Sequence, residues 1–523
     1  MVINKANFIV LKALYFIEGV SRIMRESKYL RLFLSPDGSN FDSFVEVLRN
    51  CMAHLKVWWA VPSPIPEDVD LLREGSRLPE AGEPPEQVLA DLVMRLKRCR
   101  RLNDRDLSFM RPSPNVYSVV ALCMASLQNP NNASRVRWVG GKHAAAFQYE
   151  VTPNIEEESI RMLADIVGFD RSRAGGSIVS GGTVAILTAL LVARDKSLKS
   201  VVKEGLFGRK SAKVLTSKAS HFAIRKAMRI LGLGENNLIE VPVATDEQLK
   251  EFVKSRTSLP LKPSESEYEE RLEELEKRGE TVIAVIPTVG TTAARTIEPV
   301  EPLVKLRNRY GFQLVVDAAF GGFARLLDEP AKKMRGIEES DAVIIDPHKW
   351  GYVPYPCGAV LFRNSEDLKL LEYEVPYYEP APTVEGSRPG SSAAALWVAL
   401  KTLGKEGYRE VIGRCIENAK YLEKRLREEG HYPVHEVDLN TVNFDVKCDT
   451  CNRRAQNKLN ERVVEEINRR RRFLVGFIRE LAGIKIDGEP LSTIHVEFMN
   501  PYTSRELIEE FIDELKHAYR NAI

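Results

Sequence analysis

The sequence predicts an α/β protein in which a mixed, mostly parallel sheet forms the core of the larger domain. Between residues 126 and 400, short apolar runs alternate with segments of helical periodicity, the pattern of a parallel sheet with helices on both faces. The strand-like runs are 178–179, 213–215, 282–286, 313–316 and 342–345. From residue 401 the pattern changes to long helices with strand-like runs at 437–446 and 493–498, which predicts a smaller α+β domain.

The first 125 residues have a mainly helical pattern, with proline-rich interruptions at 61–66 and 81–85. A chain of this length is expected to contain more than one structural unit. We therefore expect a helical segment over 1–125, a large domain over 126–400 and a small C-terminal domain over 401–523. The highly charged stretch 265–280 is expected to form a solvated surface helix.

The composition is that of a globular protein without a charge-driven partner. The 523 residues are 44% hydrophobic and 28% charged, and 75 basic against 73 acidic residues leave a net charge of +2. This balance gives no reason to expect nucleic acid or an anionic membrane as a partner. Lys12 and Glu18 interrupt the apolar stretch 8–20, which argues against a signal peptide, and no run reaches the ~18 apolar residues of a membrane span. We expect a cytoplasmic protein.

Seven cysteines in so long a chain do not resemble a disulfide framework. Cys448 and Cys451 form the one C-x-x-C pair, for which a metal or redox role is the functional interpretation. A single pair supplies only half of a structural zinc site, so we expect two loop thiols and no metal.

A lysine follows the apolar run 342–345, in the segment D-P-H-K-W-G-Y-V-P-Y-P-C-G that starts at Asp346. Lys349 thus lies just past the carboxyl end of a buried strand, where ligands collect in α/β proteins. A buried lysine loses its proton more readily, and a neutral amine can attack an aldehyde to form a Schiff base. The neighbouring run 313–316 ends in Asp317. A lysine and a carboxylate for a pyridinium nitrogen predict a pyridoxal phosphate site.

The pair His348-Lys349 and the G-Y-V-P-Y segment after it resemble the lysine motif of the group II pyridoxal phosphate-dependent decarboxylases, and most of all the microbial tyrosine decarboxylases. The similarity extends from about Asn129 to Asn500. It implies the aspartate aminotransferase-like fold, called fold type I, with a seven-stranded sheet in the large domain. It also implies a homodimer, with the N-terminal segment at the interface.

The segment S-G-G-T-V-A, which starts at Ser180, is the candidate phosphate site. Gly181 and Gly182 allow a tight turn, Thr183 is a suitable N-cap, and a helix follows from Val184. A helix start presents free N–H groups to an anion. An ordinary strand-to-helix turn is the alternative. The resemblance places Gly182, Thr183 and Val184 at the cofactor phosphate.

The resemblance assigns two further residues to the cofactor ring. His221 matches a histidine that stacks on the pyridine ring and orients the substrate carboxylate; alternatively it is a cap or surface histidine. Asp317 would keep the pyridine nitrogen protonated, although aspartate is also a common helix start. Ala319, with Gly321 and Gly322, supplies small residues where a flat ring must pass.

Several polar residues are weaker candidates. Thr291 and Thr292 resemble the family's Gly-Thr-Thr turn, where a hydroxyl would bind the ring oxygen or the substrate; a plain turn is the alternative. His348 would position or bind the phosphate, or simply pack. Ser387 and Ser391 match a segment that contacts the phosphate, in the same or the neighbouring subunit.

Tyr355 aligns with a tyrosine that donates a proton to the substrate in the tyrosine decarboxylases. A phenol with a pKa of about 10 can protonate a strongly basic carbanion. Packing within an aromatic loop is the alternative, and other tyrosines that follow the lysine are rivals for the role: Tyr352, Tyr373, Tyr377 and Tyr378. Lys349, His221 and Tyr355 are therefore the candidate catalytic residues.

The implied activity is decarboxylation of an L-amino acid, with tyrosine or another aromatic amino acid as the favoured substrate. Glutamate or aspartate decarboxylation, carbon–carbon bond cleavage and a non-catalytic cofactor-binding scaffold are the alternatives. Family members often carry arginine where His495 stands, so a substrate carboxylate bound at that position would make His495 a determinant of specificity.

Overall fold

The computed structural model describes residues 38–66, 78–133, 151–208, 212–373 and 381–523. The apolar stretch 8–20 and the candidates Tyr377 and Tyr378 lie outside these residues. The chain divides into two compact units, one of residues 1–106 with 468–474 and one of residues 107–467 with 475–523.

The smaller unit contains α2 (Phe41–Trp59) and α3 (Pro85–Leu96), in agreement with the helical pattern of this part of the sequence. Arg101 is almost completely buried in this unit. Its Nε donates to the carbonyl oxygen of Trp58 at 2.8 Å, and its Nη1 donates to that of Ser63 at 2.8 Å. These bonds hold the proline-rich segment at the end of α2, where the sequence predicts an interruption.

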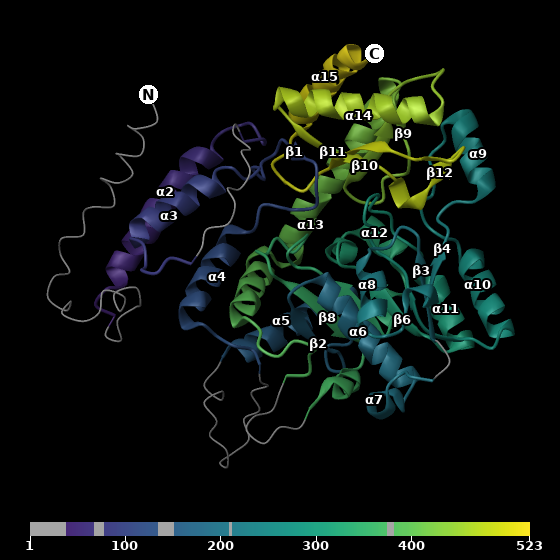
Figure 1. Ribbon diagram of the computed structural model, residues 1–523, viewed down its shortest axis with the longest axis horizontal. Helices are drawn as coiled ribbons and strands as arrows, with labels where there is room; N and C mark the ends of the chain where they lie inside the picture. Colours follow the sequence, from purple (N-terminus) through teal and green to yellow (C-terminus); the bar gives the residue numbers. More distant parts are fainter. Residues whose placement is uncertain (1–37, 67–77, 134–150, 209–211, 374–380) are drawn as a thin grey trace. The chain divides into compact units, whose positions relative to one another are not determined.

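The larger unit is built on a seven-stranded sheet with the strand order β2-β8-β7-β6-β5-β3-β4 (Figure 1). The strands are β2 (Gly175–Val179), β3 (Ala212–Ser217), β4 (Leu238–Val241), β5 (Thr281–Ile286), β6 (Gln313–Asp317), β7 (Ala342–Ile345) and β8 (Gly358–Phe362). Only β8 runs antiparallel to its neighbours β2 and β7, and the other pairs are parallel. The predicted α/β class with a mixed, mostly parallel sheet is confirmed.

Helices cover both faces of this sheet. Successive residues of a strand point to opposite sides, so each buried strand packs against helices on both faces. The helices of this unit are α4 (Val116–Gln128), α5 (Thr152–Val167), α6 (Gly182–Ser197), α7 (Val201–Glu204), α8 (Ala223–Ile230), α9 (Asp246–Ser255), α10 (Glu265–Lys277), α11 (Glu301–Tyr310), α12 (Asp328–Lys333), α13 (Gly390–Glu428), α14 (Arg453–Arg470) and α15 (Arg505–Ala522). Val343 and Leu361 pack in one apolar cluster with α5, α10, α11 and α13, whereas Ile344 and Val360 pack in a second cluster with α6 and α8.

A second, antiparallel sheet lies in the C-terminal part of this unit. Its neighbouring strands are β11 (Leu474–Ile478), β14 (Thr493–Glu497), β10 (Thr441–Asp445) and β9 (Tyr432–Pro433). The short strand β1 (Asp106–Leu107) follows β11 in the order of this sheet, and β12 (Lys485–Ile486) and β13 (Glu489–Pro490) pair with each other separately. The run 437–446 forms a strand only over β10, whereas the run 493–498 matches β14 closely. Helix α13 crosses residue 400, the expected domain boundary, and has a non-helical residue at Gly404.

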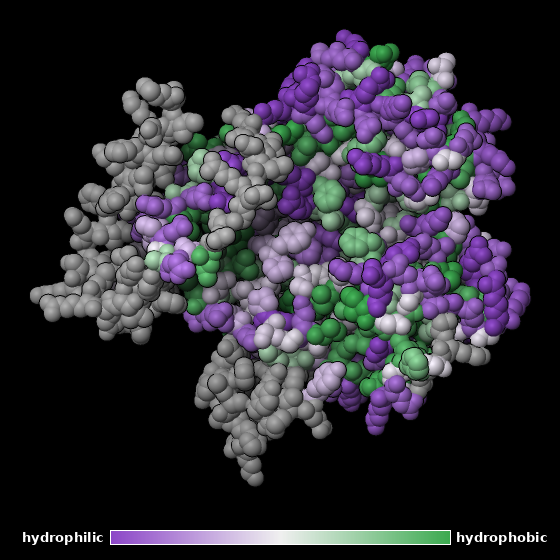
Figure 2. Space-filling model, viewed as in Figure 1, coloured by the Kyte–Doolittle hydropathy of each residue, from purple (hydrophilic) through white to green (hydrophobic). Residues whose placement is uncertain are grey.

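The charged stretch 265–280 forms α10, which buries only Tyr268, Leu272 and Leu275. Figure 2 shows hydrophilic residues covering the edge where α9 and α10 lie in Figure 1. The expected surface helix is therefore confirmed. Among the described residues, no helix is both long and apolar enough to cross a membrane.

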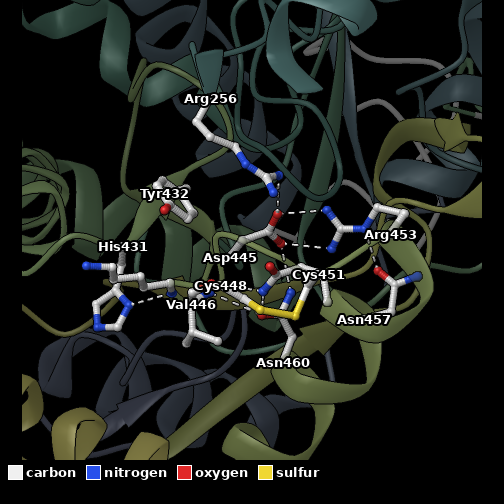
Figure 3. A network of polar contacts seen from close by, with 12 residues as sticks. Arg256, His431, Tyr432, Asp445, Val446, Cys448, Cys451, Arg453, Asn457 and Asn460 are labelled. Carbon is white, nitrogen blue, oxygen red and sulfur yellow. Dashed lines mark hydrogen bonds and ion pairs between the residues drawn. A yellow bond between two sulfur atoms is a disulfide. The ribbon is translucent and has the colours of Figure 1, made fainter. Parts of the chain in front are cut away.

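Cys448 and Cys451 are joined by a disulfide in the segment between β10 and α14 (Figure 3). The expectation of two loop thiols is wrong, because the turn brings the two Cα atoms to 5.5 Å, within the range that a disulfide spans. The bridge lies beside a buried ion pair in which Nη1 of Arg453 is 2.7 Å from Oδ2 of Asp445. Asn460 also donates to Asp445, at 2.8 Å.

Candidate active site

Three of the predicted site residues lie at the carboxyl ends of strands in one sheet. Asp317 is the last residue of β6, Lys349 follows β7, and His221 lies in the turn after β3. Burial raises the pKa of the Asp317 carboxyl, and the charge of Lys349 opposes this rise. The same lysine charge acts on His221. The tertiary structure therefore gathers these side chains at one edge of the sheet, as their positions after strands predict.

The amine of Lys349 is held by a carboxylate whose role the sequence did not indicate. Its Nζ lies 2.9 Å from Oδ2 of Asp346, which is 2% exposed. The other oxygen, Oδ1, is buried without a hydrogen-bond partner among the described residues. A Cβ at Gly182 would lie 2.7 Å from Oδ2, and one at Gly358 would lie 2.8 Å from Oδ1. Glycine is therefore required at both positions for the backbone to approach this carboxylate.

The candidate phosphate site is the first turn of α6, which begins at Gly182 with Gly181 as its N-cap. The expectation that Thr183 caps this helix is wrong, because Thr183 already lies within the helix and the chain turns two residues earlier. Gly358 packs directly against this turn, since a Cβ there would lie only 2.5 Å from the Cα of Gly181. Gly182, Thr183 and Val184 form this first turn. The backbone N–H groups of a first helical turn are the donors that bind anions.

His221 is partly buried between the end of β3 and the start of α8. Burial, and then the positive charge of Lys349, lower the pKa of its imidazole to about 4, so the ring is neutral at pH 7. Its Nδ1 accepts a hydrogen bond from the N–H of Ala223 at 3.2 Å. The hydrogen of the neutral ring therefore lies on Nε2, which leaves this nitrogen as a donor.

His348 and Tyr355 form a stacked pair beside Asp346. Their ring centroids are 3.9 Å apart with an angle of 23° between the planes. Burial lowers the pKa of His348, whose Nδ1 accepts from the N–H of Cys357 at 3.3 Å and whose Nε2 lies 3.5 Å from Asp346. Tyr355 is 48% exposed. The alternative proton donor Tyr352 is buried, with its hydroxyl against the thiol of Cys415, so it packs in the core.

Thr291 and Thr292 differ in environment. The Thr291 hydroxyl is buried and lies 2.7 Å from that of Thr296, so it serves the turn itself. Thr292 is exposed, and its N–H donates to the carbonyl oxygen of Ala219, two residues before His221. Thr292 is therefore the threonine whose hydroxyl is open to a ligand.

Ala319 is buried beside Asp317 and donates its N–H to the Asp317 carboxylate at 3.2 Å. The nearby glycines, which the sequence analysis expected beside the ring, are also required by the packing of the chain itself. A Cβ at Gly321 would lie 2.6 Å from the carbonyl oxygen of Val289, and one at Gly322 would lie 2.8 Å from Ile345. These two glycines are needed for close packing of the chain after β6.

The segment that carries Ser387 and Ser391 is anchored by an arginine that the sequence did not single out. Arg388 is buried and forms an ion pair with Glu156, and its Nη2 donates to the carbonyl oxygen of Asn132 at 2.7 Å. Ser391 is buried in the first turn of α13, and Ser387 accepts from the side chain of Asn131 at 3.2 Å.

His495 lies on β14 and is buried. Its Nδ1 lies 2.9 Å from the side-chain oxygen of Asn443, and its Nε2 lies 3.5 Å from Glu497. Glu497 also accepts from Arg295 at 2.9 and 3.2 Å. Both ring nitrogens of His495 therefore face protein groups, which argues against His495 itself as the site for a substrate carboxylate.

The residues at this edge of the sheet fit pyridoxal phosphate. Lys349 offers an amine for the aldehyde, Asp317 offers a buried carboxylate for the pyridine nitrogen, and α6 begins with a glycine turn for the phosphate. The buried Oδ1 of Asp346, which lacks a partner among the described residues, marks a place where a polar group is still needed.

Comparisons with known proteins agree with this chemistry. Residues 142–447 match the pyridoxal-dependent decarboxylase conserved domain. A protein of Archaeoglobus fulgidus named probable L-aspartate decarboxylase is 29% identical over 71% of this chain and 86% of its own length. The L-tyrosine/L-aspartate decarboxylase of Methanocaldococcus jannaschii is 31% identical over 56% and 70%, and the aromatic-L-amino-acid decarboxylase of Bacillus atrophaeus is 28% identical over 82% and 85%.

Solved structures show the same fold at low identity. The structure of Oryza sativa TDC with PLP and tryptamine has a TM-score of 0.78 and 18% identity, and covers 93% of this chain and 99% of that one. Mouse CSAD in apo form has a TM-score of 0.76 and 19% identity, over 91% and 99%. These likenesses establish fold type I. Since the family domain matches more than half of the sequence, the chain belongs to the pyridoxal-dependent decarboxylases, enzymes that use pyridoxal phosphate to remove the carboxyl group of an amino acid.

Proposed function

We propose that this decarboxylase acts on tyrosine or a related aromatic amino acid. The observation that carries the choice is the pairing of the buried cations around the site. Lys349 pairs with Asp346, and Arg295 pairs with Glu497. Arg388 pairs with Glu156 in the same way. None of these three cations is free to neutralise a second carboxylate on a substrate side chain, so a neutral aromatic side chain is favoured over aspartate or glutamate.

The proposed roles follow from the chemistry of each side chain. When bound, pyridoxal phosphate supplies an aldehyde that bonds to an amine and a ring that withdraws electrons from the substrate. Asp317 holds the proton on the ring nitrogen, and the first turn of α6, with Gly182, Thr183 and Val184, binds the phosphate. His348 and Ser391 support that phosphate. Thr292 binds the ring or the substrate.

His221 is proposed to lie against the cofactor ring and to orient the substrate carboxylate. Its neutral imidazole, with the hydrogen on Nε2, supports this role because it can donate a hydrogen bond without adding a charge that would hold the carboxylate too firmly. Ala319 flanks the ring next to Asp317. A carboxylate that is oriented but weakly bound leaves more easily as carbon dioxide.

Tyr355 is proposed to protonate the Cα atom after carbon dioxide has left. Its partial exposure and its stacking on His348 support the role, since the loop after Lys349 keeps the phenol at the surface of the site and not in the core. Tyr373, which is 76% exposed, is the remaining rival among the described tyrosines, whereas Tyr352 is excluded by its burial.

We further propose that two copies of the chain assemble into a homodimer in the cytoplasm. One face of α4 supports this assembly, because it exposes large apolar side chains, which are Val116, Tyr117, Val120, Met124 and Leu127. Such a row on one helix is typical of a surface that another protein covers. We also propose that each copy has a helical segment over 1–125, a large domain over 126–400 and a small domain over 401–523.

Aspartate is the second candidate substrate, because the relatives from Archaeoglobus fulgidus and Methanocaldococcus jannaschii carry aspartate in their names. The decisive experiment incubates the purified chain and pyridoxal phosphate with tyrosine, phenylalanine, tryptophan, aspartate or glutamate separately. Mass spectrometry then detects the amine and carbon dioxide. Tyramine or another aromatic amine supports the proposal. β-Alanine as the dominant product overturns it in favour of aspartate, and cleavage products without carbon dioxide point to a carbon–carbon lyase.

A further inference from the structure

Glu298 is a completely buried carboxyl group behind the active site that the proposed roles leave unused. It lies in the segment between β5 and α11. One carboxyl oxygen accepts from the hydroxyl of Ser217, at the end of β3. The other accepts from the N–H of Thr288 at 2.8 Å and from the hydroxyl of Tyr268 at 3.5 Å. A single carboxyl group thus joins the ends of two neighbouring strands.

Both strand ends lead directly to residues of the site. Thr288 pairs with Asp317 as an isolated parallel bridge, and the N–H of Val289 donates to the carbonyl oxygen of Asp317 at 2.8 Å. On the other side, the Ser217 hydroxyl accepts from the N–H of Ala219, two residues before His221. Glu298 therefore connects the segment that carries Asp317 with the segment that carries His221.

Among the described residues, Glu298 contacts hydrogen-bond donors and no cation. Ser217, Thr288 and Tyr268 are neutral, and Asp317 is the charged group that acts on Glu298. Burial, and to a lesser degree the charge of Asp317, raise the pKa of Glu298 to about 7. Below this pH the group is neutral. Above it, Glu298 carries a negative charge that interacts with that of Asp317, and a cation at Asp317 would stabilise both.

We propose that Glu298 is a positioning residue that places a second negative charge behind Asp317 and thereby strengthens the binding of the protonated pyridine ring of pyridoxal phosphate. The reason is mutual stabilisation. A positive ring nitrogen at Asp317 attracts the charge of Glu298 as well, so binding of the cofactor favours ionised Glu298. By linkage, ionisation of Glu298 then raises the affinity for the cofactor by the same factor.

The test is the affinity of the apoprotein for pyridoxal phosphate between pH 5.5 and 8.5, measured by absorbance titration for the native chain and for Glu298→Gln. The glutamine keeps the shape, an oxygen for Thr288 and a donor for Ser217, but carries no charge. We expect the ratio of the two dissociation constants to be near one below about pH 6 and to rise to about tenfold above pH 8, which equals a shift of one pKa unit in Glu298 on binding. Groups that titrate alike in both proteins, such as the cofactor phosphate, cancel in this ratio.

A ratio that stays constant over the whole pH range overturns the proposal, because a purely structural role of Glu298 has no reason to depend on pH. The matched control is Glu338→Gln, which removes a carboxylate that pairs with Arg325. The ratio of its dissociation constant to that of the native chain should not change with pH.

Ser217→Ala tests the proposal with the carboxyl group intact, and it decides the matter if Glu298→Gln does not fold. Loss of the Ser217 hydroxyl removes a bond that lowers the pKa of Glu298, so ionisation moves to higher pH. The ratio of dissociation constants, Ser217→Ala over native, should pass through a maximum between about pH 7 and 8. A ratio without such a maximum contradicts the proposal.

Discussion

The polar clusters around Glu298 and Glu497 show how the same side chain behaves differently in two buried places. Neither carboxyl group is exposed. At Glu497, burial alone would raise the pKa, but the adjacent guanidinium of Arg295 lowers it to about 2. At Glu298, only neutral donors and the like charge of Asp317 are present, and the pKa rises to about 7. The presence of a cation, and not the depth of burial, decides the charge of each group at neutral pH.

The cation-paired arrangement joins segments that are far apart in the sequence, and under our proposal the cation at Glu298 is the cofactor ring itself. Arg295–Glu497 connects the turn after β5 to β14, and Arg388–Glu156 connects the segment before α13 to α5. Lys349–Asp346 is the paired cluster that must open, because the lysine amine has to be free to react. Variants that remove a cation, a carboxylate or a neighbouring hydroxyl separate the two arrangements.

The largest effect is expected for Lys349→Ala, which removes the cation of the pair that must open. We expect no measurable amine product and no visible absorbance from a covalently attached cofactor, because no other amine occupies this position. The absorbance spectrum with pyridoxal phosphate and the mass of borohydride-treated protein measure attachment. Covalent labelling that survives in Lys349→Ala would show that another lysine holds the cofactor.

Tyr355→Phe keeps the ring stacked on His348, next to the paired cluster, and removes only the hydroxyl. We expect a fall in amine production of about 10²–10⁴-fold, with cofactor binding retained, because the Cα atom loses its proton donor. Some substrate should instead leave as an aldehyde, with its amino group left on the cofactor. Product analysis by mass spectrometry distinguishes amine from aldehyde. An unchanged rate of amine formation would remove Tyr355 from the mechanism, and Tyr373→Phe is the matched variant.

Arg295→Met converts the paired cluster into an unpaired one, because Glu497 loses its buried cation. We expect a loss of about 3–5 kcal/mol in the free energy of unfolding, since an uncompensated charge remains in the interior. The loss should shrink as the pH falls and Glu497 takes up a proton. Chemical denaturation at pH 5 and pH 8 measures both effects, and the exposed pair of Arg95 and Asp91 offers a control in Arg95→Met, for which little change is expected.

Glu298→Gln is expected to alter stability less and with a characteristic pH dependence. The pKa of this carboxyl is about 7 in the folded chain against an ordinary value of 4.5, so its contribution to stability is present below pH 4.5 and is lost as the pH rises through 7. Glutamine does not titrate, so the variant does not lose this stability. Its free energy of unfolding relative to that of the native apoprotein should therefore rise by on the order of 1–3 kcal/mol between pH 5 and pH 8. Equal melting temperature differences at both pH values would show that Glu298 does not titrate in this range.

Local sequence patterns predicted the class of the fold and the edge of the sheet at which the site lies. The runs 313–316 and 342–345 form β6 and β7, and the residues that follow them, Asp317 and Lys349, lie at one edge. This prediction succeeds because strand periodicity and position after a strand are properties of a few consecutive residues. A local pattern did not locate the start of α6, which begins at Gly182 and not after Thr183, beside the close approach of Gly358 to Gly181.

The pairing of charges could not be predicted, because it depends on residues that are far apart in the sequence. The bond from Ser217 to Glu298 spans 81 residues, and the ion pair between Arg295 and Glu497 spans 202. Even Asp346, which stands three residues before Lys349, showed no sign of its contact until the turn after β7 brought the two side chains together. The sequence by itself determined which chemical groups the chain possesses and the order of its strands and helices. Only the tertiary structure decided which carboxyl groups meet a cation, and that choice sets their charge because electrostatic energy in a buried site depends on distance and not on sequence order.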